Sequence, residues 1–371
     1  MITRRHFTRD LGSLLLMGQL AGELSLARRA VAGMAVPDDT IWLDANENPA
    51  GPPPSAISAI VNGAAATARY HFEEFAAFSE ALAESEGLTP QQVLFGIGSG
   101  DVINAAICAF TSSSRPLITG APTYEIPVEF ARKLGSNAVQ IRLADDWQFP
   151  VKELADEAAK AGGGLIYLCN PNNPTSSRTA NTALKWLVDN LPANTILLVD
   201  EAYVHFAEPT EIQSAITYVK DNCNVVVTRT FSKIYGMAGA RVGFACAKPE
   251  LIRQMMPFKN NVIPILGLRA AMAALRDRSD LVPSRRATVA HIRGQLCDWL
   301  REKNIGYITP FGNFIMIDVG RDARAFGRDM LRRGVAVGRL FPPLHKMLRV
   351  TIGTEREMTR FRQTFWEVYS G

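Results

Sequence analysis

The sequence predicts an α/β fold, with a large doubly wound domain followed by a smaller α+β domain. Short apolar runs alternate with helical stretches between residues 93 and 247. These runs are apolar throughout, which is typical of strands buried on both faces of a sheet. After residue 260 the order changes to long helices followed by short strands. A chain of 371 residues is also long enough for two hydrophobic cores.

The large domain is expected to begin after a proline-rich loop at residues 46–54 and a helix at 55–67. Its expected strands are residues 93–95, 116–119, 139–143, 165–169, 196–200, 225–228 and 242–247. The expected helices between them are residues 101–110, 122–134, 151–161 and 181–189.

The C-terminal part has a different pattern, which predicts the smaller domain. Its expected elements are helices at 267–276 and 283–303, strands at 314–319, 335–337 and 348–352, and a helix that starts at 355. We therefore expect four regions: an export signal at 1–35, an N-terminal segment at 36–62 that joins the small domain, the large domain at 63–262 and the small domain at 263–371.

The first residues resemble a twin-arginine export signal. Residues 3–9 contain paired arginines, then a phenylalanine and a further basic residue; an apolar stretch follows at 11–21, and small residues at 33–35 suit cleavage. Glu23 interrupts the apolar stretch, and an amphipathic helix is the alternative. The stretch is too short to span a membrane, so no stable membrane insertion is expected. Export to the periplasm is the prediction, with a cytoplasmic location as the alternative.

Composition excludes several classes of protein. The net charge is only +4, and beyond the N-terminus the basic residues are scattered, so no nucleic-acid partner is expected. The five cysteines are an odd number, are far apart and lack the spacing of zinc ligands. We expect free thiols, no disulfide framework and no metal site.

Polar residues follow three of the expected strands. Residues 165–169 lead to Asn173, residues 196–200 end in Asp200 with Tyr203 close behind, and residues 225–228 lead to Lys233. The carboxyl ends of parallel strands form the ligand-binding edge of an open α/β sheet. The sequence therefore predicts that an amide, a carboxylate, a phenol and an amine meet at this edge.

This combination indicates a pyridoxal phosphate cofactor. The Lys233 amine would form a Schiff base with the cofactor aldehyde, and Asp200 would keep the pyridine nitrogen protonated. Asn173 and Tyr203 would bind the 3-oxygen of the ring.

The phosphate of that cofactor also needs a binding site. The glycine-rich turn at residues 96–101 follows a strand and opens a helix, so its backbone N–H groups and the helix dipole favour an anion. Thr230, Ser232 and Arg241 would add hydrogen bonds and charge.

The chain resembles the fold type I pyridoxal-phosphate aminotransferases, and most of all the histidinol-phosphate aminotransferase branch. The resemblance implies a doubly wound mixed sheet in the large domain. The matching stretches cover nearly the whole chain after the signal: residues 43–49, 69–70, 122–124, 170–175, 200–203, 230–243 and 348–353.

This resemblance implies a role for each matching residue. Lys233 would also shuttle a proton, and together with Asp200 and Tyr203 it forms the expected catalytic set. Tyr124 would stack on the ring, Arg349 and Asn46 would bind the substrate, and Tyr70 would reach the neighbouring subunit's phosphate in a homodimer with shared active sites. The remaining expected phosphate ligands are Ser99, Gly100, Ser232 and Arg241.

Departures from the family pattern concern the substrate. Ser176 replaces a usual glycine, and Gly100-Asp101 replaces Asp-Glu in the phosphate turn. In the family, an arginine that helps bind histidinol phosphate directly follows the stretch that corresponds to residues 334–337. In this chain Gly338 stands between that stretch and Arg339. These changes leave the cofactor site intact and leave the substrate open.

The predicted function is transfer of an amino group between an amino acid, or a similar amine, and a 2-oxo acid. The alternative is another pyridoxal-phosphate reaction on the same fold: decarboxylation, racemisation, elimination or cyclisation. A transcription regulator would need an N-terminal DNA-binding domain, and a binding protein without activity would be expected to lose Lys233.

Overall fold

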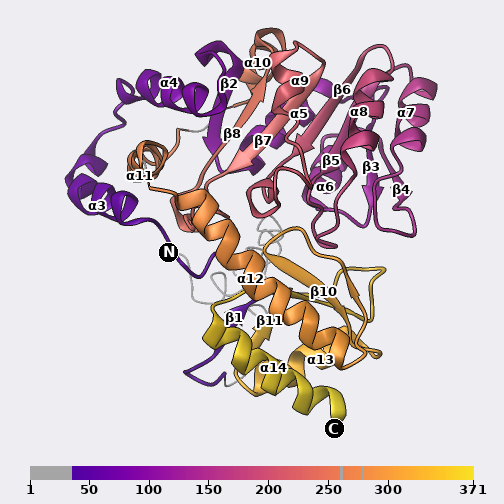
Figure 1. Cartoon of the computed structure of the whole chain (residues 1–371). Helices are drawn as coiled ribbons and strands as arrows, with labels where there is room; N and C mark the ends of the chain where they lie inside the picture. The colour runs from indigo at the N-terminus through magenta and orange to yellow at the C-terminus, as the bar shows by residue number, and fades with distance from the viewer. Residues whose placement is uncertain (1–35, 260–261, 278) are drawn as a thin grey trace, which may run out of the picture.

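A large domain built on one seven-stranded sheet lies against a smaller C-terminal domain (Figure 1). The computed structural model describes residues 36–259, 262–277 and 279–371. The predicted export signal at 1–35 lies outside the described residues.

All seven strands predicted for the large domain form and pair in one sheet, in the order β2-β8-β7-β6-β5-β3-β4. The pairings from β7 through β6, β5 and β3 to β4 are parallel, whereas β8 is antiparallel to both of its neighbours. The sheet is therefore mixed and doubly wound, as predicted. Its strands are β2 (Val93–Ile97), β3 (Leu117–Ala121), β4 (Ala138–Arg142), β5 (Gly164–Cys169), β6 (Thr195–Asp200), β7 (Val225–Thr230) and β8 (Val242–Ala247).

Helices cover both faces of this sheet because successive strand residues point to opposite sides. In β5, Ile166 and Leu168 join one apolar cluster, and Leu165 and Tyr167 join the other. The second cluster is closed by α5 (Ser99–Phe110), α6 (Ile126–Lys133) and α10 (Pro249–Met255). The first is closed by α4 (Glu74–Glu86), α7 (Val151–Lys160), α8 (Asn181–Asp189), α9 (Ile216–Lys220) and α11 (Ile265–Arg276).

The C-terminal domain has its own apolar core and two small sheets. One sheet is antiparallel, in the order β12-β10-β9, and the other pairs β1 with β11 in parallel. The long helix α12 runs from the large domain along the small one (Figure 1). The elements are β1 (Ile41–Leu43), α12 (Leu281–Glu302), β9 (Tyr307–Ile308), β10 (Phe314–Asp318), α13 (Ala323–Arg332), β11 (Val335–Val337), β12 (Met347–Thr351) and α14 (Glu355–Ser370).

Some elements differ from the sequence prediction. The helix expected at 55–67 is α3 (Pro54–Gly63) followed by a 3-10 helix, and α4, α9, α10, α13, β1 and β9 were not predicted. α3 packs on α11, which contributes to the large-domain core cluster, while β1 pairs with the small domain. The predicted domain boundaries remain predictions. The short 3-10 helices are Ala64–Ala68, Pro90–Gln92, Val204–Phe206, Ala238–Ala240 and Met256–Phe258.

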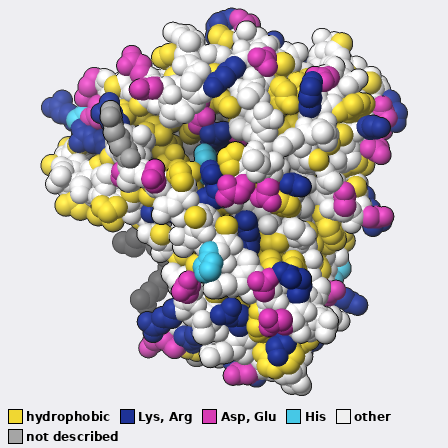
Figure 2. Space-filling view, in the orientation of Figure 1, with side chains coloured by type: hydrophobic (Ala, Val, Ile, Leu, Met, Phe, Trp, Pro, Cys, Tyr) yellow, Lys and Arg dark blue, Asp and Glu magenta, His cyan; other side chains and the backbone are white. Residues whose placement is uncertain are grey.

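The surface of the described part mixes charges. Figure 2 shows Lys and Arg interspersed with Asp and Glu over both domains on the face in view, and hydrophobic side chains gathered around α3. Among the described residues, no helix is both long and apolar enough to cross a bilayer. The five cysteines are free, as expected.

Candidate active site

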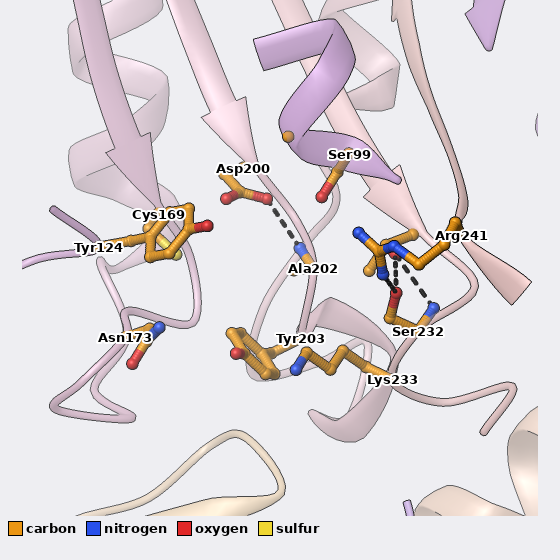
Figure 3. Close-up of a pocket in the computed structure, with 12 residues that line it drawn as sticks. Ser99, Tyr124, Cys169, Asn173, Asp200, Ala202, Tyr203, Ser232, Lys233 and Arg241 are labelled. Carbon is orange, nitrogen blue, oxygen red and sulfur yellow. Dashed lines mark hydrogen bonds between the residues drawn. The ribbon is translucent and has the colours of Figure 1, made fainter. Parts of the chain in front are cut away.

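The structure brings ten of the predicted residues into one pocket at the carboxyl ends of β5, β6 and β7 (Figure 3). The empty space within it, including the part open to solvent, is about 540 Å³. Of the residues predicted to bind the cofactor, Tyr70 is the one that does not line it. The lining residues are Ser99, Gly100, Tyr124, Cys169, Asn173, Asp200, Ala202, Tyr203, Thr230, Ser232, Lys233 and Arg241.

One end of the pocket is built to bind an anion. It combines the N-terminus of α5, where Ser99 and Gly100 lie, with hydroxyl groups and a guanidinium. Thr230 Oγ1 donates to Ser232 Oγ at 2.9 Å, and Arg241 Nη1 lies 3.5 Å from the same oxygen. A helix N-terminus beside an arginine attracts a phosphate.

A glycine at the turn makes this arrangement possible. Gly98 has a φ of +72°, and a Cβ atom there would lie 2.6 Å from Arg241 Nη2. Any side chain at residue 98 would therefore push the guanidinium away from the helix N-terminus.

Asp200 lies at the end of β6 and is almost fully buried. Its Oδ2 accepts a hydrogen bond from the Tyr167 hydroxyl at 3.0 Å, and its Oδ1 accepts from Thr228 Oγ1 and from the Ala202 N–H, both at 3.2 Å. Several donors stabilise the ionised form of a carboxylate. This carboxylate can therefore face a protonated ring nitrogen.

Tyr167 and Cys169 were missed by the sequence analysis. Burial, reinforced by the negative charge of Asp200, raises the pKa of the Tyr167 hydroxyl well above its usual value, and it acts in the same way on the Cys169 thiol. Both groups therefore stay protonated near neutral pH. A tyrosine in an otherwise apolar strand was the signal available in the sequence.

Lys233 projects from the loop after β7 toward Tyr203 (Figure 3). Its Nζ donates to the Ala45 carbonyl at 3.2 Å and lies 5.5 Å from the centre of the Tyr203 ring. The Tyr203 hydroxyl accepts a hydrogen bond from Asn46 Nδ2 at 3.1 Å. The N-terminal segment therefore contacts two residues of the pocket, although Asn46 itself does not line it.

Arg349, in β12, does not line the pocket but contacts Asn173, which does. Its Nη1 donates to Asn173 Oδ1 at 2.7 Å, and its Nη2 donates to the Asp44 carbonyl at 2.8 Å. A guanidinium that lies beside Asn173 is placed to bind a carboxylate with two parallel hydrogen bonds.

Gly338, one of the residues that depart from the family pattern, lies against Arg349. A Cβ atom at Gly338 would lie 2.8 Å from the Arg349 carbonyl oxygen and 3.2 Å from its Nε. The absence of a side chain at residue 338 therefore lets Arg349 pack against this backbone. Arg339 is the next residue in the chain. Arg339 forms an ion pair with Glu125 and stacks on Phe341.

The departure at residue 176 also has a structural explanation. Ser176 has a φ of +58°, the region that glycine usually occupies, and its hydroxyl accepts a hydrogen bond from the Gly312 N–H at 2.9 Å. This bond ties the loop after β5 to the small domain.

Tyr70 lies on the surface at 69% exposure and stacks on Phe72. Among the described residues, His71, Glu73 and Glu74 could in principle share a metal ion. These groups already bond to one another and to Arg269, however, and none lines the pocket.

The donor set fits pyridoxal phosphate. Anion donors occupy one end of the pocket, the Asp200 carboxylate with three donors of its own lies at the end of β6, and the Lys233 amine points toward Tyr203. The steric requirement for glycine at residue 98 keeps the anion end open.

Comparison with known proteins agrees with this geometry. The profile of aminotransferase class I and II matches residues 38–365. A histidinol-phosphate aminotransferase of Symbiobacterium thermophilum is 34% identical over 330 residues, which are 87% of this chain and 89% of that protein. The same enzyme of Moorella thermoacetica is 30% identical over 343 residues, 89% and 86% of the two chains.

Solved structures show the same similarity. The histidinol-phosphate aminotransferase of Sinorhizobium meliloti in complex with pyridoxal-5'-phosphate has a TM-score of 0.83 at 26% identity, over 93% of this chain and 94% of that one. The aspartate aminotransferase of Thermus thermophilus with maleate shares the fold, with a TM-score of 0.77 at 20% identity and 99% coverage of both chains.

Proposed function

The chain belongs to the class I and II aminotransferase family and is a pyridoxal-phosphate enzyme; on this premise we propose a role in amino transfer for each residue of the site. The observation that carries the proposal is the meeting of Asn173, Asp200 and Lys233 in one pocket with Arg349 at its edge. When bound, pyridoxal phosphate supplies an aldehyde that takes up amines and a ring that stabilises negative charge on the neighbouring carbon.

Three side chains of the protein hold the cofactor, move the proton and orient the substrate. Lys233 Nζ would hold the cofactor before the substrate arrives, and its freed amine would then move the proton from the substrate Cα to the aldehyde carbon of the cofactor. Asp200 holds the proton on the ring nitrogen. Arg349 binds the substrate carboxylate and so places the Cα proton toward Lys233.

The other pocket residues hold and orient the cofactor. Ser99, Gly100, Thr230, Ser232 and Arg241 bind its phosphate. Asn173 and Tyr203 bind the 3-oxygen, Tyr124 covers one ring face, and Asn46 orients Tyr203.

Membership of the family favours transamination over decarboxylation, racemisation, elimination or cyclisation. The test mixes the purified enzyme with a panel of amino acids and follows the cofactor absorbance. We expect reactive amino acids to convert the cofactor to its amine form and release a keto acid, and a 2-oxo acid to reverse the change. Substrates that react and leave the aldehyde form regenerated, without a keto acid, would contradict transamination.

A second measurement tests the lysine. Lys233→Ala is expected to remove the absorbance band of the covalently bound cofactor and to abolish activity. Survival of that band would show that another amine carries the cofactor.

We further propose that the protein is a homodimer with shared active sites. Tyr70 is exposed, lies outside the pocket of its own chain and stacks on the exposed Phe72; Ile57 and Val61 of α3 are also exposed. A contiguous apolar surface is typical of a subunit interface. A tyrosine on that surface is placed to reach a neighbouring subunit's site.

We also propose export through the twin-arginine route. The supporting observation is the sequence at residues 3–9, together with the route's ability to carry a protein that has already folded around its cofactor. Fusion of residues 1–35 to a reporter should direct it to the periplasm, and replacement of Arg4 and Arg5 by lysine should retain it. Export of the doubly substituted fusion would contradict the assignment.

A further inference from the structure

We propose that Asn48 and Arg285 are positioning residues that hold the backbone next to Lys233 and thereby direct its amine into the pocket. The inference rests on the proposed function, since it concerns the lysine that bonds the cofactor. Neither Asn48 nor Arg285 lines the pocket, so each acts through Lys233.

The backbone at Lys233 is anchored in the small domain. Lys233 lies in the loop between β7, which ends at Thr230, and β8. A lysine side chain is a flexible four-carbon stem, so the position of its amine depends on how firmly the backbone is held. The next residue, Ile234, is 1% exposed and belongs to the same apolar cluster as Leu43 of β1 and Val289 of α12. The loop that follows a strand of the large domain is therefore held by elements of the small one.

Two side-chain donors converge on the Ile234 carbonyl. Asn48 Nδ2 donates to it at 3.0 Å from the N-terminal segment, and Arg285 Nη1 donates to it at 2.9 Å from α12. Arg285 Nη2 also donates to the Gly51 carbonyl at 2.7 Å. One guanidinium thus joins the Lys233 loop to the N-terminal segment, and its planar fork fixes the two carbonyls relative to each other.

The two loops touch directly beside this guanidinium. Gly236 has a φ of +68°, and a Cβ atom there would lie 2.1 Å from the Gly51 carbonyl oxygen. The Gly236 N–H donates to the Lys233 carbonyl at 3.0 Å, which closes a turn over residues 233–236. The N-terminal segment therefore packs against the turn that carries Lys233 and leaves no room for a side chain at residue 236.

The N-terminal segment also contacts the lysine side chain itself. Lys233 Nζ donates to the Ala45 carbonyl at 3.2 Å. The Asn48 amide is fixed in turn, because its Oδ1 accepts from the Ala50 N–H at 3.1 Å. Residues 45–51 thus hold the backbone beside Lys233 and meet its amine. Loss of the contacts at the Ile234 carbonyl frees this backbone, so a bond between the amine and the cofactor aldehyde then costs more conformational entropy.

The test compares two forms of the cofactor that differ in their ability to bond Lys233. Pyridoxal phosphate carries the aldehyde, whereas pyridoxamine phosphate carries an amine in its place and forms no covalent bond with the lysine. Calorimetric titration of the full-length protein, freed of cofactor, gives a dissociation constant for each form. We expect Arg285→Met to weaken the binding of pyridoxal phosphate about tenfold, the effect of roughly one hydrogen bond. The affinity for pyridoxamine phosphate should stay unchanged.

Further variants separate positioning from general stability. Asn48→Ala, which removes the second donor to the same carbonyl, should have the same selective effect. Arg293→Met is the matched control: Arg293 lies on the same helix and donates to the Gly312 carbonyl at 2.8 Å, outside the Lys233 loop. Both of its dissociation constants should equal those of the wild type. In a Lys233→Ala background, Arg285→Met should cause no further loss of affinity, because its effect passes through the lysine.

Equal weakening of both cofactor forms by Arg285→Met would overturn the inference, because it would reveal a general structural role. Unchanged affinities in Arg285→Met would overturn it too, as would a loss for pyridoxal phosphate that persists in the Lys233→Ala background. A wild-type protein that binds pyridoxal phosphate without an absorbance band that depends on Lys233 would instead overturn the proposed function.

Discussion

At the scale of single residues, the surroundings of Asp200 decide how well it can serve the cofactor. The carboxylate accepts from Tyr167, Thr228 and Ala202, and it lies at 3% exposure. A buried carboxylate without such donors would tend to take up a proton. Tyr167 therefore acts through Asp200 and does not contact the substrate.

Removal of the Tyr167 hydroxyl tests this role. Tyr167→Phe is expected to lower kcat by about ten- to a hundredfold, because a hydrogen bond to a charged group is worth about 1.5–3 kcal/mol. KM for the amino acid should stay unchanged. Tyr218→Phe, at a half-buried tyrosine outside the pocket, is the control for hydroxyl loss. Equal kcat values for Tyr167→Phe and wild type would contradict the role.

A second residue-scale prediction concerns acid stability. Burial, with the positive charges of Arg229 and Arg286, lowers the pKa of His205 to about 3 from 6.5. Because the folded pKa is depressed, the unfolded chain binds more protons between pH 6.5 and 3. Stability is therefore fully present above pH 6.5 and falls toward pH 3.

The measurement is the melting temperature as a function of pH. His205→Gln should flatten its fall over that interval, although the variant starts from a lower value. His345→Gln, at an exposed histidine, should leave the slope as in the wild type. The same slope in all three proteins would show that His205 does not carry the effect.

At the scale of elements, a buried ion-pair network fixes the strand ends that carry the site. Arg229 in β7 donates from Nη1 to Glu86 of α4 at 2.7 Å and from Nη2 to Glu201 at 3.0 Å, next to Asp200. Burial opposes the charge of Arg229, but the two carboxylates outweigh it and raise its pKa. Burial also raises the pKa of Glu86, against the pull of Arg229.

Loss of the central cation should destabilise this arrangement. Arg229→Met leaves two buried carboxylates without their partner, and we expect a loss of about 3–5 kcal/mol in the free energy of unfolding. Urea denaturation provides the measurement. Arg253→Met, which breaks an exposed pair with Glu250, should cost about 0–1 kcal/mol. Similar values for the two variants would contradict a structural role for the buried network.

At the scale of the whole molecule, the sequence predicted those features that depend on local pattern. Most of the seven strands were predictable because they are apolar on both faces, whereas the edge strand β4 alternates apolar with polar residues. The residues at their carboxyl ends followed from the parallel order. α4 was missed because its buried residues Phe78 and Leu82 stand among acidic residues. The contact between Arg349 and Asn173 joins positions 176 residues apart and depends on how the two domains meet. The pair of Glu125 with Arg339 likewise has no signal in the sequence.

The proposed sharing of each active site between two subunits is tested with hybrid dimers, which combine two different variants. Tyr70→Phe is expected to weaken cofactor affinity about tenfold or more, through loss of one hydrogen bond to a charged phosphate. Lys233→Ala is inactive on its own. If Tyr70 serves the partner, a mixed dimer has one site with an intact lysine and an intact tyrosine, which come from different subunits.

The two variants, unfolded and refolded together in equal amounts, should then recover about a quarter of wild-type activity at limiting cofactor. Random pairing makes half of the dimers hybrids, and each hybrid has one complete site out of two. Each variant refolded alone supplies the control, and sedimentation checks that both form dimers. If Tyr70 served its own subunit, both sites of the hybrid would be defective and mixing would restore nothing. Recovery on mixing therefore decides between the two geometries whatever the identity of the amino donor.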